Sequence, residues 1–348
     1  MDMFYIGFRD PLFSIIIFFT IIFLITFFSY WWGRYRRKEN STHLDRFLEQ
    51  FRALPSENEL KVLISSGELS QKSWMLLAAS YSKNGDYEKS IEIYNELLKV
   101  SEKENLFEIM FILGKTYFKA GFLERSRQIF LEILKYNPRT PQALHYLLLV
   151  YEYMRDYQAA IDVLEPLDEL GEDILLDKTY LTALTLLQNV KFSEEEKAQK
   201  LLNLYKENHK LAYMIFEFLF RVNPQIAWEN LHLEDAELLT EVLWRLDSKD
   251  LNLDIIAKSK YLQELYSARG DVTLVTESAI FELDVLIGLQ GRANATLSFE
   301  YVCKSCKATN PFGFTRCSAC HAIDSAMVEY GLSKDYIKEF SEENNSFQ

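Results

Sequence analysis

The hydrophobic pattern of the chain begins with one uninterrupted apolar segment near its start. No charged residue occurs between Leu12 and Trp32. A helix of that length rises about 1.5 Å per residue and spans roughly 30 Å, the thickness of a bilayer's hydrocarbon core. A cleaved signal peptide is the alternative, but the apolar stretch is too long and no small-residue cleavage site follows it. We therefore predict one uncleaved transmembrane helix over residues 12–32.

The charges on either side of this segment predict its orientation. Arg34, Arg36, Arg37 and Lys38 follow it directly, whereas the segment before it offers only Arg9. Positive charge stays on the cytoplasmic side of a membrane. We therefore expect residues 1–11 to be extracytoplasmic, and residues 33–70, a basic juxtamembrane segment with the first helices, to begin the cytoplasmic bulk of the protein.

Downstream of the juxtamembrane segment, a helical pattern recurs with a period close to 34 residues. The positions Leu77, Tyr81 and Gly85 recur as Leu113, Tyr117 and Gly121, and again as Leu147, Tyr151 and Arg155. A leucine and a tyrosine four residues apart share one helix face, and the glycine allows a tight turn. A period near 34 with two helical patterns is typical of the tetratricopeptide repeat. The pattern therefore predicts three such repeats over residues 71–172.

The register of the repeat fades beyond residue 172, although amphipathic stretches continue. These stretches are Ile174–Gln188, Ser193–Glu207, Ala212–Arg221, Ala236–Arg245, Ile255–Ala268 and Leu274–Leu289. We interpret residues 173–292 as three degenerate helical pairs that extend the same solenoid, because each repeat buries its apolar face only against its neighbours. A solenoid of this kind presents a concave face suited to peptides or partner helices.

The composition agrees with a mostly helical protein and argues against one class of partner. Only 12 Gly and 7 Pro occur among 348 residues, too few for a turn-rich all-β fold. The formal net charge of −13 argues against nucleic acid, because phosphate binding needs clustered Lys and Arg. We expect no nucleic-acid partner.

The most specific local signal is a pair of cysteine knuckles near the C-terminus. Cys303-Lys-Ser-Cys306 and Cys317-Ser-Ala-Cys320 are separated by ten residues and contain all the cysteines of the chain. Each knuckle can present two thiolates to one tetrahedral ion, which suits Zn²⁺ or, as the alternative, iron. We predict a metal ribbon over residues 298–332, followed by a tail over residues 333–348. Four sulfur ligands leave no open position for catalysis.

No other pattern in the sequence points to catalysis. The chain has no phosphate-binding glycine loop, no nucleophile elbow and no HExxH helix. The five histidines, at 43, 145, 209, 232 and 321, show no ligand spacing. We expect His321 to be a surface neighbour of the metal site. The sequence therefore predicts a protein that is not an enzyme.

Three features in this order resemble one known family: an anchor with a basic flank, tetratricopeptide repeats and a four-cysteine ribbon. The chain is similar to LapB (YciM), the lipopolysaccharide assembly protein B family of Gram-negative bacteria. The resemblance is strongest at Tyr30-Trp31-Trp32-Gly33-Arg34 and from Tyr301 to Cys320. Lys307 and His321 stand where rubredoxin knuckles usually have glycine, and Ser318 where they usually have proline.

The resemblance implies an all-α tetratricopeptide-repeat solenoid with one N-terminal transmembrane helix and a small C-terminal rubredoxin-like zinc ribbon. It also implies a single-pass protein of the inner (cytoplasmic) membrane. Its function would be that of an adaptor that regulates lipopolysaccharide (lipid A) synthesis by helping the protease FtsH degrade the deacetylase LpxC. The four cysteines carry over as metal ligands. A redox-active iron ribbon and a repeat scaffold for another envelope assembly system stay open as alternatives, as does homo-oligomerisation.

Overall fold

The computed structural model describes residues 57–66, 69–101, 103–290 and 294–334, together with Phe23, Leu24 and Phe27. The predicted transmembrane helix therefore lies almost wholly outside the described residues, as do residues 1–11 and most of residues 33–70 and of the tail. Within the described ranges, no helix is long and apolar enough to span a bilayer. The chain divides into two compact units, Met1–Tyr146 and Leu147–Gln348.

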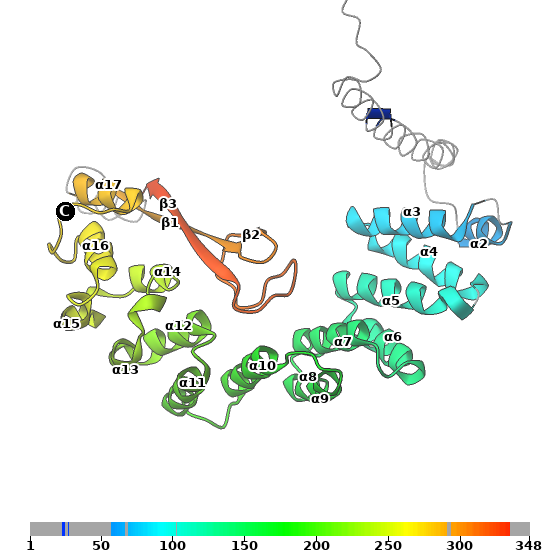
Figure 1. Cartoon of the computed structure of the whole chain (residues 1–348), viewed down its shortest axis with the longest axis horizontal. Coiled ribbons are helices and arrows are strands. Elements are labelled where there is room, and N and C mark those ends of the chain that lie inside the picture. Colours follow the sequence, from blue (N-terminus) through cyan, green and yellow to red (C-terminus); the bar gives the residue numbers. More distant parts are fainter. Residues whose placement is uncertain are drawn as a thin grey trace, which may run out of the picture. The chain divides into compact units, whose positions relative to one another are not determined.

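The first unit is built of helices that pack in sequential pairs (Figure 1). They are α2 (Glu57–Ser66), α3 (Gln71–Lys83), α4 (Tyr87–Val100), α5 (Lys103–Lys119), α6 (Leu123–Tyr136) and the start of α7 (Pro141–Tyr153). Trp74 and Tyr94 are almost fully buried between α2, α3, α4 and α5. The helices of the first two predicted repeats are therefore present.

The turns within the three predicted repeats share one backbone conformation. Gly85 and Gly121 have φ of 87° and 80°, and Arg155, which replaces the glycine in the third repeat, has φ of 60°. In each turn the next backbone N–H donates to the carbonyl of the repeat's tyrosine, at 2.9 Å in all three cases. The three turns therefore have the same structure, including the position where the sequence departs from glycine.

Close helix packing explains a second glycine of the repeat. A Cβ added to Gly114 in α5 would lie 2.9 Å from Cζ of Phe130 in α6. Beside it, Ser126 donates a hydrogen bond of 2.9 Å to the Gly114 carbonyl. Both contacts require the two helices to approach closely, which a larger residue at 114 would prevent.

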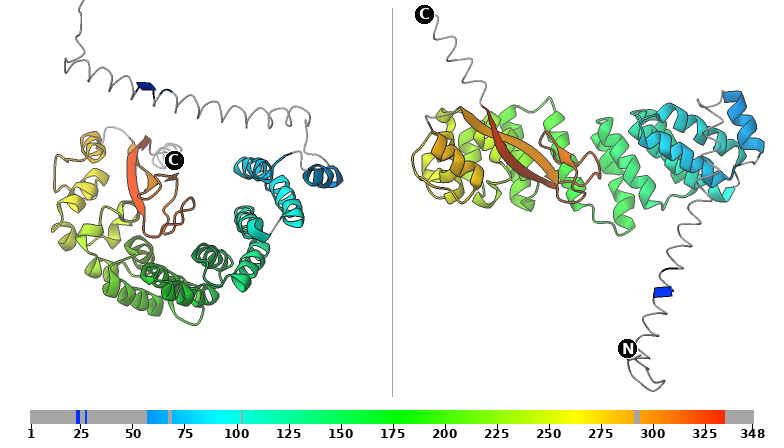
Figure 2. Two further views of the ribbon diagram at one scale, coloured as in Figure 1. Left: turned by 45° about the vertical axis from the view of Figure 1, so that its right-hand side comes forward. Right: turned by 90° about the horizontal axis from the view of Figure 1, so that it is seen from above.

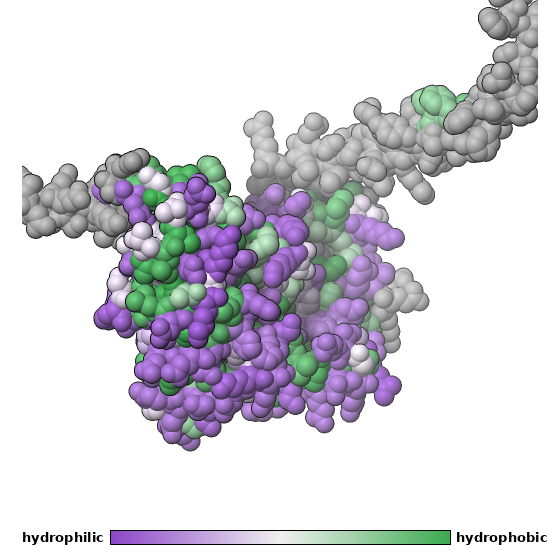
Figure 3. Space-filling model, turned by 60° about the vertical axis from the view of Figure 1, so that its left-hand side comes forward, coloured by the Kyte–Doolittle hydropathy of each residue, from purple (hydrophilic) through white to green (hydrophobic). Residues whose placement is uncertain are grey.

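The second unit continues from the C-terminal part of α7 through shorter helices. These are α8 (Tyr157–Asp162), α9 (Leu164–Glu169), α10 (Leu175–Gln188), α11 (Glu194–Asn208), α12 (Ala212–Val222), α13 (Pro224–Asn230), α14 (Thr240–Trp244), α15 (Leu253–Ile256), α16 (Lys260–Arg269) and α17 (Phe281–Leu289). The helices predicted over Ile174–Gln188, Ser193–Glu207 and Ala212–Arg221 are confirmed within one residue. The space-filling view shows a largely hydrophilic visible face with scattered apolar patches (Figure 3).

The last three predicted helices are wrong in their extent. Ala236–Arg245 is helical mainly in α14, Leu274–Leu289 only in α17, and Ile255–Ala268 is divided between α15 and α16. Local caps explain the division of Ile255–Ala268, because the side chains of Asn252 and Ser259 each accept a backbone N–H and start a new helix.

The helix α13, which was not predicted, also begins at a local side-chain cap. Pro224 stands at its first position, and the Asn223 side chain accepts the backbone N–H of Ile226. Proline suits the first turn of a helix because its missing N–H would have no partner there. A short helix therefore follows α12 directly.

The C-terminal ribbon is a three-stranded antiparallel sheet in the order β2-β1-β3. Strands β1 (Ala295–Cys303) and β3 (Ala326–Lys334) pair along their whole length, and β2 (Thr309–Asn310) pairs with the end of β1. The ribbon is therefore slightly longer at both ends than the predicted residues 298–332. The β1–β3 hairpin lies along the inner side of the curve formed by α10 to α16 (Figure 2), and Leu297, Tyr301 and Ala326 belong to the same buried core as those helices.

Candidate metal centre

The four cysteines meet where β1 ends. Their sulfur atoms all lie within 4.8 Å of one another. Cys303 Sγ lies 3.6 Å from Cys320 Sγ, and Cys306 Sγ lies 3.7 Å from Cys317 Sγ. Four sulfurs at about 2.3 Å from a tetrahedral ion are roughly 3.8 Å apart, whereas a disulfide requires about 2.0 Å. The arrangement is therefore compatible with four ligands to one ion and not with disulfide bonds.

The two knuckles repeat the same backbone structure. The N–H of the first cysteine in each knuckle donates to a carbonyl five residues later, Cys303 to Ala308 and Cys317 to Ala322, both at 2.9 Å. Lys307 and His321 occupy matching left-handed positions, with φ of 62° and 63°. Glycine is the residue that adopts this conformation without strain, and the sequence has a lysine and a histidine at these two positions instead. Lysine and histidine at these positions change the side chain but leave the backbone conformation of the knuckle the same.

Hydrogen bonds favour the thiolate form at the buried end of the cluster. Burial raises the pKa of Cys303, but the Ser325 hydroxyl and the backbone N–H groups of Cys306 and Ser305 lower the pKa to about 6. At Cys306 the backbone N–H of Ala308 lowers the pKa, while burial and the neighbouring thiols raise it to about 12. Four adjacent sulfurs cannot all be ionised without a cation, and a bound metal removes that penalty.

A buried arginine next to the second knuckle attaches the cluster to the helices. Arg316 Nε lies 2.8 Å from Glu152 Oε2, and Nη2 lies 2.9 Å from Asp177 Oδ1. The guanidinium also stacks 5.1 Å from the ring centre of Tyr180, whose hydroxyl donates to Glu152. The Arg316 and Glu152 side chains are only 8% and 9% exposed. Each of these two buried charges is therefore compensated by the other.

Two opposing effects act on the pKa of Glu152. Burial raises its pKa, and the charge of Arg316 opposes that shift. Removal of one partner from such a pair leaves the other buried and uncompensated, which is strongly destabilising. The contact thus makes the position of the second knuckle depend on α7 and α10.

A second attachment lies on the strand that leads to the first knuckle. The fully buried Tyr301 of β1 donates a hydrogen bond to Glu241 in α14. Its hydroxyl lies 3.4 Å from that of Tyr213 in α12. The Tyr213 ring also covers Gly313 in the loop between the knuckles, where any Cβ would overlap it. Burial raises the pKa values of both tyrosines, so both remain protonated donors at neutral pH.

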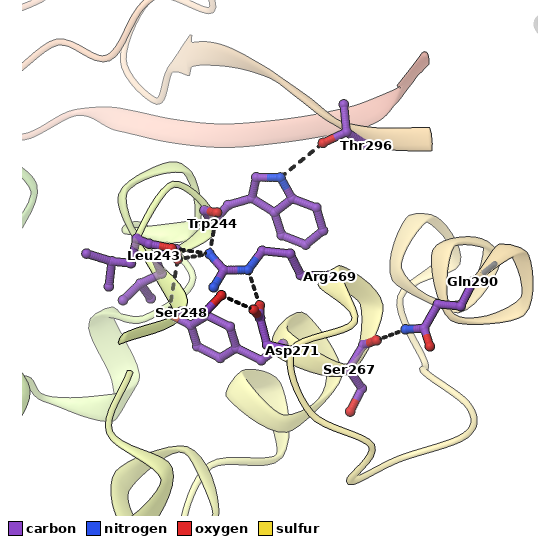
Figure 4. Close-up of polar contacts among 10 residues, drawn as sticks. Leu243, Trp244, Ser248, Ser267, Arg269, Asp271, Gln290 and Thr296 are labelled. Atoms are coloured by element: carbon purple, nitrogen blue, oxygen red, sulfur yellow. Dashed lines mark hydrogen bonds and ion pairs between the residues drawn. The ribbon is translucent and has the colours of Figure 1, made fainter. Parts of the chain in front are cut away.

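A third attachment joins the far end of β1 to α14 and α16 (Figure 4). The indole N–H of Trp244 donates to Thr296 Oγ1 at 3.1 Å. Arg269 donates to the carbonyls of Trp244 and Leu246, both at 2.6 Å, and pairs with Asp271. These bonds satisfy the carbonyls at the end of α14 and hold Trp244 under the strand.

The structure brings together all four cysteines that the sequence pattern indicated, and the cluster of potential ligands in the described residues does not include His321. The Arg316 contacts were missed. A signal was available, since Glu152 is the only charged residue of α7 and follows a run of aliphatic residues. The structure also places His209 and His232 side by side, with ring centres 4.7 Å apart, which their sequence spacing did not indicate.

Comparison with known proteins identifies the repeat. Residues 71–104 match the tetratricopeptide repeat family. A tetratricopeptide repeat protein from Parabacteroides merdae ATCC 43184 is 16% identical, with a TM-score of 0.39 over 72% of this chain and 97% of that one. MamA from Desulfovibrio magneticus RS-1 is also 16% identical, with a TM-score of 0.34 over 51% of this chain and 93% of that one.

Matches this distant carry no information on function, and no curated protein matches the chain. The described residues nevertheless form a mostly helical solenoid with a four-cysteine cluster compatible with a metal ion such as zinc. In sequence, residues 71–104 are similar to the tetratricopeptide repeat.

Proposed function

We propose that this chain is a non-enzymatic, membrane-anchored adaptor that holds other proteins on its repeat solenoid. The observation that carries the proposal is the shared core of the ribbon and the helices in the second unit. Because a single metal ion would organise the ribbon, and the ribbon covers the inner side of those helices, the second unit acts as a metal-dependent structural end of the solenoid.

The first unit then offers the surface for a partner. A cavity of about 560 Å³ lies between α3 and α5, lined by Lys72, Met75 and Glu108 among others. Leu76 beside it is 61% exposed. Further along α5, Lys115 lies over the rings of Phe111 and Tyr146 at 5.6 and 5.2 Å. Apolar, aromatic and charged groups on these helices suit an extended peptide segment of a client.

We place this adaptor at the inner membrane, in the control of lipopolysaccharide (lipid A) synthesis, where it presents the deacetylase LpxC to the protease FtsH. The support is the order of anchor, repeats and four-cysteine ribbon along the chain, which resembles the LapB (YciM) family. Anchoring on the same membrane as the protease raises the effective concentration of the bound client near it.

The test is affinity recovery of crosslinked partners from intact membranes that contain the full chain. FtsH and LpxC are expected in the recovered material, and deletion of residues 1–32 should strongly reduce the recovery of FtsH. A variant with Leu76→Ser should lose the client if the first unit binds it. Leu175→Ser serves as the matched control, because this leucine of the second unit is 60% exposed, close to the 61% of Leu76.

Recovery of a different envelope complex, with neither FtsH nor LpxC, would instead support the scaffold alternative. Metal analysis separates the remaining alternative. One zinc per chain is expected in native protein, and stoichiometric iron with a reversible redox couple would support a redox role.

A further inference from the structure

Two histidines from different loops of the second unit form a close pair outside the cysteine cluster. His209 follows α11, and His232 precedes the short 3₁₀ helix Leu233–Asp235. Their ring centres lie 4.7 Å apart with an interplanar angle of 75°. Both side chains are exposed. The pair therefore presents two imidazoles to solvent at one point on the surface.

A buried tyrosine forms a rigid base beneath the pair. The ring of Tyr205 lies 5.4 Å from that of His209 and 5.7 Å from that of His232, and the residue is 1% exposed. Its hydroxyl donates to Asp235 Oδ2 at 2.5 Å, and its ring packs edge-on against Phe216 at 4.9 Å. Because Tyr205 belongs to α11 and Asp235 follows His232, this bond holds the two loops together.

His209 has an unusual backbone conformation. His209 ends α11 in the left-handed conformation, with φ of 48°, and its N–H donates to the Tyr205 carbonyl at 2.7 Å. Glycine is the default residue at such a helix end. A histidine in this conformation is strained, and strained residues cluster at functional sites. The contact of His209 with a second imidazole therefore indicates a functional role for the pair.

The spacing of the two rings fits a shared metal ion. At a metal–nitrogen distance of about 2.05 Å, two imidazoles on one ion have ring centres roughly 4.5–5.2 Å apart for ligand angles of about 90–109°. The observed 4.7 Å falls within this range. We propose that His209 and His232 form a second metal site, for a divalent late first-row transition ion such as Ni²⁺, with water completing its coordination.

Imidazole nitrogen, rather than charge, would provide the affinity of this site. The exposed Lys206 and Lys210 flank His209 along the chain and disfavour a hard cation held by electrostatic attraction. Neutral imidazole prefers nickel, copper and zinc to magnesium or calcium. A bound ion would link the end of α11 to the start of the 3₁₀ helix and stiffen the segment between them.

The test is calorimetric titration of tag-free full chain, already holding zinc at the cysteines, with Ni²⁺. One equivalent of Ni²⁺ is expected to bind without release of zinc, and to raise the unfolding temperature. His209→Asn and His232→Gln should each weaken this binding about tenfold or more, because one imidazole alone loses the chelate. Asparagine tolerates the left-handed conformation, so the first variant keeps the turn.

Two controls separate the site from general histidine binding. His145→Gln, in α7, should leave the affinity unchanged, and Tyr205→Phe should keep both imidazoles while removing the bond to Asp235. The proposal is overturned if no Ni²⁺ equivalent binds beyond the cysteine site, if Ni²⁺ displaces the zinc, or if the two histidine variants bind Ni²⁺ as tightly as the unchanged chain.

Discussion

The two units of this protein are stabilised in different ways. In the first unit, α3 to α6 repeat one apolar pattern, and the buried residues are mainly aliphatic and aromatic. In the second unit, a short β-ribbon carries a cluster of four thiols. A buried arginine with two carboxylates and a tyrosine–glutamate bond attach it to the helices. Repetition distributes stability over many similar contacts, whereas the ribbon concentrates it in a few polar ones. Single substitutions should therefore have larger effects in the second unit.

The largest effect should come from loss of a metal ligand. Cys303→Ser or Cys317→Ser removes one of four sulfurs, and structural zinc in small domains contributes on the order of 10–16 kcal/mol of apparent binding free energy. We expect loss of bound metal and rapid proteolysis of residues 294–334, with the first unit still helical. Metal analysis and limited proteolysis measure this, with Ser318→Ala as the control inside the second knuckle. Full metal content in both cysteine variants would remove the basis for the site.

The next largest effect should follow removal of Arg316. Arg316→Met leaves Glu152 and Asp177 without their cation, and breaking a buried pair costs about 3–5 kcal/mol. The free energy of unfolding from denaturant titration measures this loss, with Arg139→Met as the control, since Arg139 is exposed.

The same contact can be removed without leaving a buried charge. Adding Glu152→Gln to Arg316→Met should recover part of the lost stability, because the uncompensated carboxylate is gone. Equal instability of the single and double variants would mean that the contact contributes only through packing.

In the first unit, overpacking should have a moderate effect. Gly114→Ala places a methyl group against Phe130 and should destabilise the unit by about 1–3 kcal/mol. The metal content should not change, which distinguishes this effect from those in the ribbon. Gly288→Ala in α17 is the matched control, since a Cβ there meets nothing within 4 Å. Thermal unfolding of both variants shows whether the repeat contact is as close as the structure places it.

The smallest effect should be found at the repeat turns. Gly121→Ala introduces a Cβ at φ of 80° and should cost about 1 kcal/mol, whereas Arg155→Gly, at φ of 60° in the third repeat, should be neutral or slightly stabilising. Opposite signs in denaturant titrations would confirm that the two turns are equivalent. A loss of stability in Arg155→Gly would show that the arginine side chain has a structural role of its own.

The regular part of the fold was predictable because its signals are local. The repeated Leu–Tyr–Gly pattern predicted the helices and turns of residues 71–172, and the CxxC spacing predicted the cysteine cluster. Helix ends beyond residue 230 were mispredicted because polar caps such as Asn252 and Ser259 override an amphipathic pattern that continues across them. The anchor over residues 12–32 stays a prediction, since it lies outside the described residues.

By itself, the sequence determined which residues can form repeat helices and which four sulfurs can share an ion, because both properties depend on short spacings along the chain. Only the tertiary structure decided where the ribbon packs. Arg316 meets Glu152 and Asp177 across 164 and 139 positions of sequence, and His209 meets His232 through the bond between Tyr205 and Asp235. Such contacts depend on how distant helices pack, which no local spacing records.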